Sequence, residues 1–436
     1  MPSSMTAKQY QQENLKIKEQ MEKKTGKTTK QMYAEREKRS TDAIELRVPD
    51  RIPLVSHPET TLFTGIKKSA AYYDPFTFKR AMRDITLKLE PDMCNMGLPT
   101  SGEAMTILGV TNRLWPGGPL PEDYDYQFIE SEFLKEDEYD MILKDPADFM
   151  IRRMLPRMYK TLKPLYDLPP LGSLFQGFEG LIPRFSSDEF IKLGQALVKA
   201  GQEMKQFRES IGDSYGEMAE LGYPSFAHVG GGGVGGAPFD VVSSFLRGMK
   251  GSMTDMFRHP DKLIQLCNMV MDRRIAEAAP ADKTKPGLKR VGMPLWRGDK
   301  SFMSQKAYDK FYWPGLKRAL QADIDLGFVP VPFYEAEFGE RLQSLLELPK
   351  GKILASIEYV DAVKAKDILK GHTCLFVRIP LSSKLWSVQE VEDCTKDLID
   401  KVGKGGGVII DVRLPDKGTP DQCAKLMQTI KEYGKY

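Results

Sequence analysis

Four acidic side chains stand at or just after the ends of predicted strands, where α/β enzymes carry their chemistry. They are Glu335, Glu337, Glu358 and Asp411. Carboxylates gathered at one mouth repel each other unless a cation or arginines neutralise them. One reading is that Glu335, Glu337 and Glu358 hold a divalent metal, with zinc as the first choice. The other is that Glu335 and Asp411 do general acid and base chemistry.

Three arginines also fall at strand ends, namely Arg297, Arg378 and Arg413. A guanidinium pairs well with carboxylates, so we expect these residues to neutralise the acidic group or to bind the carboxylates of a substrate. The alternative for the whole set is a solvated rim with scattered salt bridges, which would carry no chemistry.

Two of the four histidines, His57 and His228, each end a predicted strand. Histidine changes charge near neutral pH, so each is a candidate proton carrier or metal ligand. We expect His228 to assist catalysis and His57 to contact substrate, and a structural, hydrogen-bonded role is the alternative for both. His372 and Cys374 form a zinc-like pair, but they begin a strand and are therefore expected to be structural.

Two aromatic residues, Trp296 and Tyr334, lie at the same strand ends. Side chains of this size would line a flat apolar pocket for a ring-shaped substrate. Ordinary core packing is the alternative.

Six strand-then-helix units in a row position these residues. Val-, Ile- and Phe-rich strands followed by helices predict parallel strands with right-handed crossovers. Two earlier strands bring the number to eight. The predicted strands are 51–57, 91–97, 224–228, 291–296, 328–334, 352–357, 373–379 and 407–412. The pattern predicts an α/β fold, a (β/α)8 TIM barrel, with an open doubly wound sheet as the runner-up.

The first 47 residues are highly charged and lack an aromatic core pattern. We interpret residues 1–47 as a helical N-terminal extension, a solvated helix or a flexible arm, and residues 48–436 as the barrel domain. The Pro-, Gly- and Trp-rich segment 97–127 is predicted to be a long loop over one face, and such loops are often lids or partner surfaces.

Composition excludes several classes of protein. The chain of 436 residues has 63 basic and 60 acidic residues, a net charge of +3, which argues against a nucleic-acid groove. No stretch is long and apolar enough for a membrane span, and the N-terminus lacks the apolar core of a signal peptide. Five scattered cysteines predict free thiols, so we expect a cytoplasmic protein.

Several segments, in order along most of residues 48–436, resemble the uroporphyrinogen decarboxylase superfamily. They are Asp50-Arg-Ile-Pro53, Tyr126-Gln-Phe128 with Asp137-Glu-Tyr-Asp140, Ala237-Pro-Phe-Asp240 with Phe245-Leu-Arg-Gly248, Pro294-Leu-Trp-Arg-Gly298, Phe302-Met-Ser304, Phe311-Tyr-Trp-Pro314, Pro332-Phe-Tyr-Glu335 with Arg341-Leu342, and Gly405-Gly-Gly407. The resemblance implies a barrel enzyme and, commonly, a homodimer.

The superfamily includes porphyrinogen decarboxylases and cobamide-dependent methyltransferases. The decarboxylases carry an arginine-containing motif after the first strand, where this chain has Ser56-His-Pro-Glu-Thr60. The thiol methyltransferases carry a His-x-Cys zinc pair where this chain has Glu335-Ala-Glu337. The resemblance therefore implies, first, a methyltransferase that moves a methyl group from a methylated substrate to the corrinoid of a partner protein. The alternatives are a decarboxylase of uroporphyrinogen or a related carboxylated aromatic or tetrapyrrole substrate, and a non-catalytic barrel binding protein.

Overall fold

A parallel sheet forms the centre of the computed structural model, which describes residues 7–57, 60–97, 100–174, 177–229, 232–284, 286–369, 371–380, 385–413 and 418–436. Its eight strands lie in the order β2-β1-β10-β9-β8-β7-β6-β5. They are β1 (Leu54–Ser56), β2 (Met93–Cys94), β5 (His228–Val229), β6 (Arg290–Leu295), β7 (Val329–Tyr334), β8 (Leu354–Ile357), β9 (Cys374–Arg378) and β10 (Val408–Val412). Neighbouring strands pair in parallel, and each overlaps a predicted strand, so the α/β class is confirmed.

The sheet curls until its two edges meet at one point. A single parallel bridge joins Cys94 of β2 to Ser225, just before β5. At this bridge the Phe226 amide donates to the Cys94 carbonyl at 2.8 Å, and the Cys94 amide donates to the Pro224 carbonyl at 2.9 Å. The structure thus shows a curled parallel sheet whose two edges are joined by this one bridge among the described residues.

The concave face of the sheet encloses a small core of its own. Because side chains alternate along a strand, every second residue points into it and its neighbours point out. The enclosed cluster consists of Val55, Met93, Phe226, Val329, Val331, Leu354, Cys374, Phe376 and Ile409, closed by Ala43 and Ile44. A larger apolar core lies on the other face, between the sheet and the helices.

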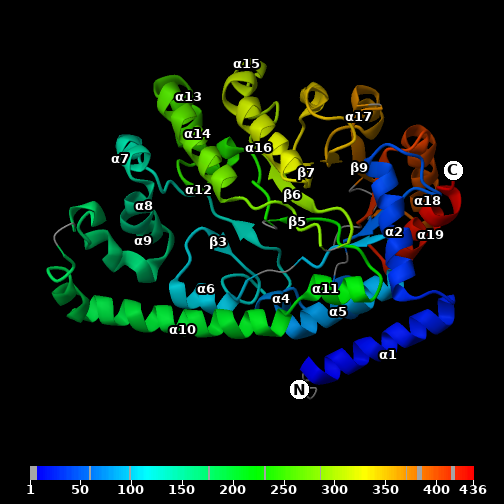
Figure 1. Cartoon of the computed structure of the whole chain (residues 1–436), viewed down its shortest axis with the longest axis horizontal. Helices are drawn as coiled ribbons and strands as arrows, with labels where there is room; N and C mark the ends of the chain where they lie inside the picture. Colours follow the sequence, from blue (N-terminus) through cyan, green and yellow to red (C-terminus); the bar gives the residue numbers. More distant parts are fainter. Residues whose placement is uncertain are drawn as a thin grey trace.

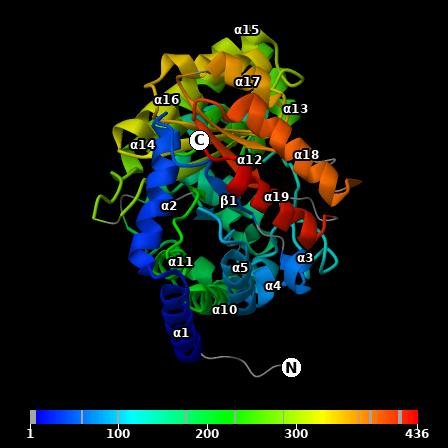
Figure 2. The ribbon, with the colours of Figure 1, turned by 90° about the vertical axis from the view of Figure 1, so that its right-hand side faces the viewer.

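Helices cover the convex face of the sheet, and Figure 2 shows α16, α17, α18 and α19 arranged around the strands. The covering helices are α12 (Pro238–Phe245), α13 (Met249–Arg258), α14 (Pro260–Glu277), α15 (Gln305–Ala307), α16 (Trp313–Asp325), α17 (Ala362–Leu369), α18 (Val388–Leu398) and α19 (Pro420–Tyr433). Gly339–Glu347, after β7, is a 3-10 helix, and Tyr308–Tyr312 and Ile399–Gly403 are π-helical turns within longer helices.

The charged N-terminal segment folds into two helices, and the second of them packs against the sheet. It forms α1 (Ala7–Thr25) and α2 (Thr29–Ile44). The last residues of α2, Ala43 and Ile44, are fully buried at the amino ends of the strands. Glu37 of α2 forms a buried ion pair with Arg290 at the start of β6, at 2.9 Å. At least one charged residue of this segment therefore forms a buried ion pair. Composition alone does not tell such a residue from one that is exposed to solvent.

A long insertion lies between β2 and β5 (Figure 1). It contains α6 (Gly102–Leu108), α7 (Tyr139–Lys144), α8 (Pro146–Phe149), α9 (Leu155–Met158), α10 (Asp188–Ile211) and α11 (Ser214–Glu220), following α3 (Thr60–Thr64), α4 (Ala70–Tyr73) and α5 (Pro75–Leu89) after β1. Short helical turns join these helices: Glu136–Glu138, Met150–Met154, Lys160–Asp167, Leu171–Ser173 and Ile182–Ser186.

One part of this insertion differs from the sequence prediction. The segment predicted as a loop at 97–127 includes α6 and one strand of an antiparallel hairpin, β3 (Arg113–Leu114) with β4 (Gln127–Phe128). Later in the insertion, α10 and α11 are separate helices, because Gly212 adopts φ 59° and ends α10. Among the described helices, none has the length and apolar character needed to cross a bilayer.

Candidate functional site

Five of the predicted site residues lie at the carboxyl ends of their strands and continue the series of inward-facing residues. They are His57, Glu335, Glu358, Arg378 and Asp411. Arg378 stands two residues after the enclosed Phe376, and Asp411 two residues after Ile409. The period of two therefore directs these polar side chains to the top of the enclosed core. The structure brings them to one mouth.

An ionic chain links four of these residues. Arg378 Nη1 donates to Glu358 Oε1 at 2.9 Å, and Arg378 Nε lies 4.0 Å from Asp411 Oδ2. Asp411 Oδ1 in turn lies 2.7 Å from His57 Nδ1. Burial alone would raise the pKa of Asp411, but His57, Arg378 and Arg413 outweigh it and hold that pKa below its usual value. Asp411 is thus an anion that fixes the orientation of the His57 ring.

The His57 ring rests on the enclosed core. Its centroid lies 5.5 Å from the Phe226 ring and 6.1 Å from the Phe376 ring. The imidazole is therefore held between an apolar floor and a buried carboxylate, with 20% of its side chain exposed. This is the environment of a group that is positioned for contact with a ligand above it.

Glu335 is a carboxyl group of the mouth with a raised pKa. Burial raises that pKa, and the nearby Glu358 carboxylate raises it further. No hydrogen bond or ion pair holds the Glu335 side chain among the described residues. A carboxyl group with a raised pKa holds its proton more tightly than an ordinary glutamate, which makes Glu335 the general-acid candidate.

A cavity of about 380 Å³ opens beside His57. This volume fits a small organic molecule. The cavity is lined by His57, Thr60, Lys68, Ala71, Tyr72, Phe78, Met82, Asn95, Gly97, Pro116, Tyr124, Asp125, Tyr126 and Arg413. The Glu335 carboxylate contributes to the raised pKa of Tyr126, so it lies near this cavity's wall.

Two predicted residues, Tyr334 and Glu337, lie elsewhere. Tyr334 is one residue out of phase with the inward positions, so its side chain is buried in the outer core, 4.7 Å from the Phe338 ring. Glu337 is exposed beyond the end of the strand, near Lys364. His228 lies in β5, and its side chain is outside the described residues.

Arg297 and Trp296 lie after β6 and are engaged with neighbours. Arg297 Nη2 pairs with Glu130 Oε2 at 2.5 Å, and its amide donates to Asp240 Oδ1 at 2.9 Å. The Trp296 indole donates to Ser244 Oγ at 2.8 Å. Neither residue lines the cavity beside His57.

The predicted carboxylate metal site does not fit this arrangement. Among the described residues, no three His, Cys, Asp or Glu side chains gather closely enough to hold a metal ion. Glu358 is hydrogen-bonded to Arg378, and Glu337 is exposed. Glu335, Glu337 and Glu358 therefore do not form one ligand set, and no chemical step is assigned to a metal.

Sequence reasoning missed the residues that the insertion and the segment after β1 bring to the mouth. Tyr72 lies in α4, well after β1 in the sequence, and Arg113 and Tyr126 belong to the hairpin region. No periodicity marks them. The only available signal was the Tyr126-Gln-Phe128 segment, which carried the family resemblance without assigning a role.

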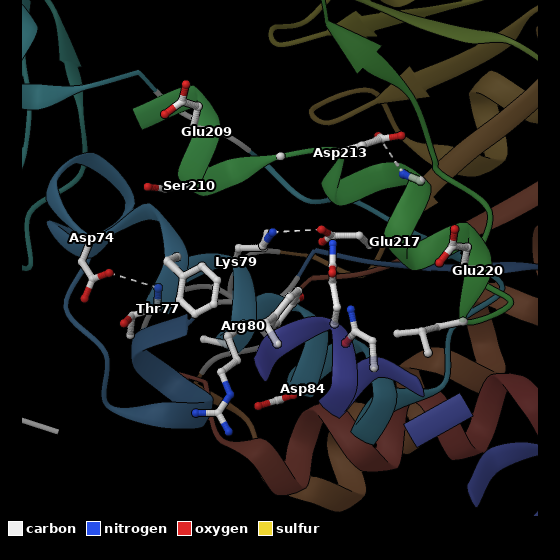
Figure 3. Close-up of a pocket in the computed structure, with 18 of the residues that line it drawn as sticks. Asp74, Thr77, Lys79, Arg80, Asp84, Glu209, Ser210, Asp213, Glu217 and Glu220 are labelled. Atoms are coloured by element: carbon white, nitrogen blue, oxygen red, sulfur yellow. Dashed lines mark hydrogen bonds and ion pairs between the residues drawn. The ribbon is translucent and has the colours of Figure 1, made fainter. Parts of the chain in front are cut away.

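A second cavity, of about 1700 Å³, lies between α1, α5 and the α10–α11 junction (Figure 3). Carboxylates outnumber cations in its lining, and the cations Lys79 and Arg80 are already paired. Lys79 Nζ donates to Glu217 Oε1 at 3.1 Å and to the Ile211 carbonyl at 2.8 Å, and Arg80 pairs with Glu13 at 2.7 Å. None of the predicted site residues lines this cavity, so we regard the mouth as the candidate site.

Comparisons with known proteins support the fold. No family model and no curated protein matches the sequence. Solved structures do match, and one is a methyltransferase from Methanosarcina mazei, with a TM-score of 0.52 and 14% sequence identity. The match covers 91% of this chain and 98% of that one. At this identity the likeness establishes a shared fold over nearly the whole length.

Proposed function

We propose that this chain is a methyltransferase with its active site at the mouth of the curled sheet. It takes a methyl group from a small methylated molecule and delivers it to a corrinoid carried by a partner protein. The observation that carries the proposal is the convergence of Glu335, Glu358, Arg378, Asp411 and His57 from separate strands. The shared fold with a methyltransferase supports the same choice.

The chemistry of demethylation explains why a protonated Glu335 matters. When the methyl group leaves its heteroatom, the electron pair of that bond stays on the heteroatom, which needs a proton to become a good leaving group. Glu335 gives this proton, and the carbon–heteroatom bond breaks as the heteroatom–hydrogen bond forms. A bound corrinoid supplies the nucleophile that accepts the methyl group.

Each neighbour of Glu335 has a role in this proposal. Burial raises the pKa of Glu335 most, and the Glu358 carboxylate raises it further, which favours retention of the Glu335 proton. Arg378 holds Glu358 in place and compensates its charge. His57, oriented by Asp411, contacts the substrate from the floor of the cavity. We also propose that the sheet is a closed barrel with the bridge between Cys94 and Ser225 as its seam.

The two alternatives lack a supporting observation. A porphyrinogen decarboxylase needs several free arginines to hold several carboxylates, but two of the three predicted arginines, Arg297 and Arg378, are paired with Glu130 and Glu358, which leaves Arg413. A non-catalytic barrel would be marked by a mouth blocked by Trp296, and Trp296 does not line the cavity. Methyl transfer therefore remains the function that the site favours.

An absorbance assay tests the proposal. The purified chain is incubated with free reduced cobalamin and a panel of methyl ethers, methylamines and methyl thioethers, and methylation of the cobalt is followed by its spectrum. We expect enzyme-dependent methylation with at least one donor class and none without donor. Conversion of uroporphyrinogen to coproporphyrin, with no methyl transfer from any donor, would establish the decarboxylase instead.

A further inference from the structure

The cationic side chains around the mouth divide into two kinds. Arg297 and Arg378 each form an ion pair with a carboxylate. Arg413 and Arg113, in contrast, form no hydrogen bond or ion pair through their side chains with any residue that the structure describes. A guanidinium that no protein carboxylate binds is available to an anionic ligand.

Arg413 faces the cavity directly. It follows β10 at the mouth and is exposed, lining the cavity together with His57. Its charge acts on Asp411, whose pKa it helps to lower. Asp411 is hydrogen-bonded to His57, and no hydrogen bond or ion pair joins it to the Arg413 guanidinium.

Arg113 acts from behind the wall of the same cavity. Its Nε atom is buried and has no hydrogen-bond partner among the described residues. Burial raises the pKa values of Tyr72 and Tyr126, and Arg113 opposes this rise at both. Both tyrosines line the cavity. A positive charge beside two phenols makes their hydroxyl groups stronger donors toward an anion.

The other charged groups of the cavity do not cancel this positive character. Lys68 pairs with Asp125 at 2.6 Å, so the acidic residue on the wall is already neutralised. The apolar side of the cavity comes from Phe78 and Met82. The cavity thus has one cationic end, two phenol donors and an apolar wall, within about 380 Å³.

We propose that the substrate is an anionic methyl donor, a small carboxylate no larger than one ring, whose carboxylate binds to Arg413, with Arg113 supporting it through Tyr72 and Tyr126. That the ligand donates a methyl group rests on the proposed function, whereas its negative charge is inferred from the cavity alone. Arg413 contacts the substrate, and Arg113 is a positioning residue.

Binding of matched charged and neutral compounds tests this proposal. The dissociation constants of 4-methoxybenzoate, 3-methoxybenzoate and methoxyacetate are measured by calorimetry, each beside its uncharged amide, without any methyl acceptor. A charge-assisted contact predicts that at least one acid binds roughly tenfold or more tightly than its amide. Arg413→Met should remove this preference, and Arg113→Lys, which keeps the charge, should retain more of it than Arg113→Met.

The control is Arg273→Met on the exposed face of α14, which should keep the full preference. Equal affinity for every acid and its amide, an undiminished preference in Arg413→Met, or no binding of any of the three pairs overturns the proposal. The binding assay contains no methyl acceptor, so its result does not depend on methyl transfer. If the protein prefers the acids here but transfers no methyl group in the cobalamin assay, the proposed function is contradicted and the anion site still stands.

Discussion

The period of two along each strand decides which predicted side chains reach the mouth. Glu335, Glu358 and Asp411 follow inward-facing residues at even spacing, so sequence alone could place them. Tyr334 stands at an odd position and therefore turns into the outer core. Glu337 lies past the strand, where the period no longer applies. The position of a residue at a strand end therefore predicts that it reaches the mouth only if the residue also falls on the inward-facing side of that strand.

Asp240 is a buried carboxyl group that the sequence did not single out. Oδ2 accepts a hydrogen bond from Tyr312 at 2.7 Å, and Oδ1 accepts one from the Arg297 amide. Burial raises the pKa of Asp240 to about 7, although these donors oppose the rise. The group therefore links the start of α12 to the turn after β6 and titrates near neutrality.

Asp240→Asn should flatten the pH dependence of stability. The folded state retains the Asp240 proton up to about pH 7, whereas an unfolded aspartate loses it near pH 4. The unfolding free energy should therefore fall as the pH rises through this window, by up to roughly 1.4 kcal/mol per unit. Subtracting the urea-unfolding free energies of the variant from those of the wild type measures this slope.

Tyr312→Phe provides the second variant for the same measurement. It removes a donor that lowers the pKa of Asp240, so the window should extend to higher pH. A wild-type slope that persists unchanged in Asp240→Asn would show that other groups cause it.

At the scale of elements, the strand-and-helix alternation predicted the sheet well. Each strand after β5 is a run of apolar, often β-branched residues followed by a helix start signal, such as Ser387 before α18, which accepts from the Glu390 amide. The hairpin β3–β4 could not be predicted, because its position over the mouth depends on packing of the whole insertion. The residues that it brings to the cavity were missed for that reason.

Helix α2 covers the amino end of the enclosed core, and its buried ion pair tests this role. Glu37→Ala would leave Arg290 buried without its carboxylate partner, since only 2% of the Arg290 side chain is exposed. We expect a loss of roughly 3–5 kcal/mol in unfolding free energy. Glu35 of the same helix pairs with Lys27 in solvent, so Glu35→Ala should change little. Equal losses in urea unfolding would mean that α2 is the loosely attached arm that its composition suggests.

At the scale of the whole molecule, two parts of the chain build the mouth. The carboxyl ends of the strands supply Glu335, Glu358, Arg378, Asp411 and His57, with Arg413 after β10, while the segments after β1 and β2 supply the cavity's tyrosines. The strands and the residues at their ends could be predicted from the sequence, whereas the segments after β1 and β2 carry no periodic signal, so their share of the cavity's lining could not.

The most direct test compares Glu335→Gln with Glu337→Gln, two residues apart, in single-turnover methyl transfer from an accepted donor to free reduced cobalamin. The account predicts a loss of roughly 10²–10⁴-fold for Glu335→Gln, since it removes the general acid, and a nearly wild-type rate for Glu337→Gln. The wild-type rate should fall as the pH rises through the raised pKa of Glu335, and this limb should vanish in Glu335→Gln. A wild-type rate in Glu335→Gln, or equal losses in both variants as a shared metal would give, would contradict the account.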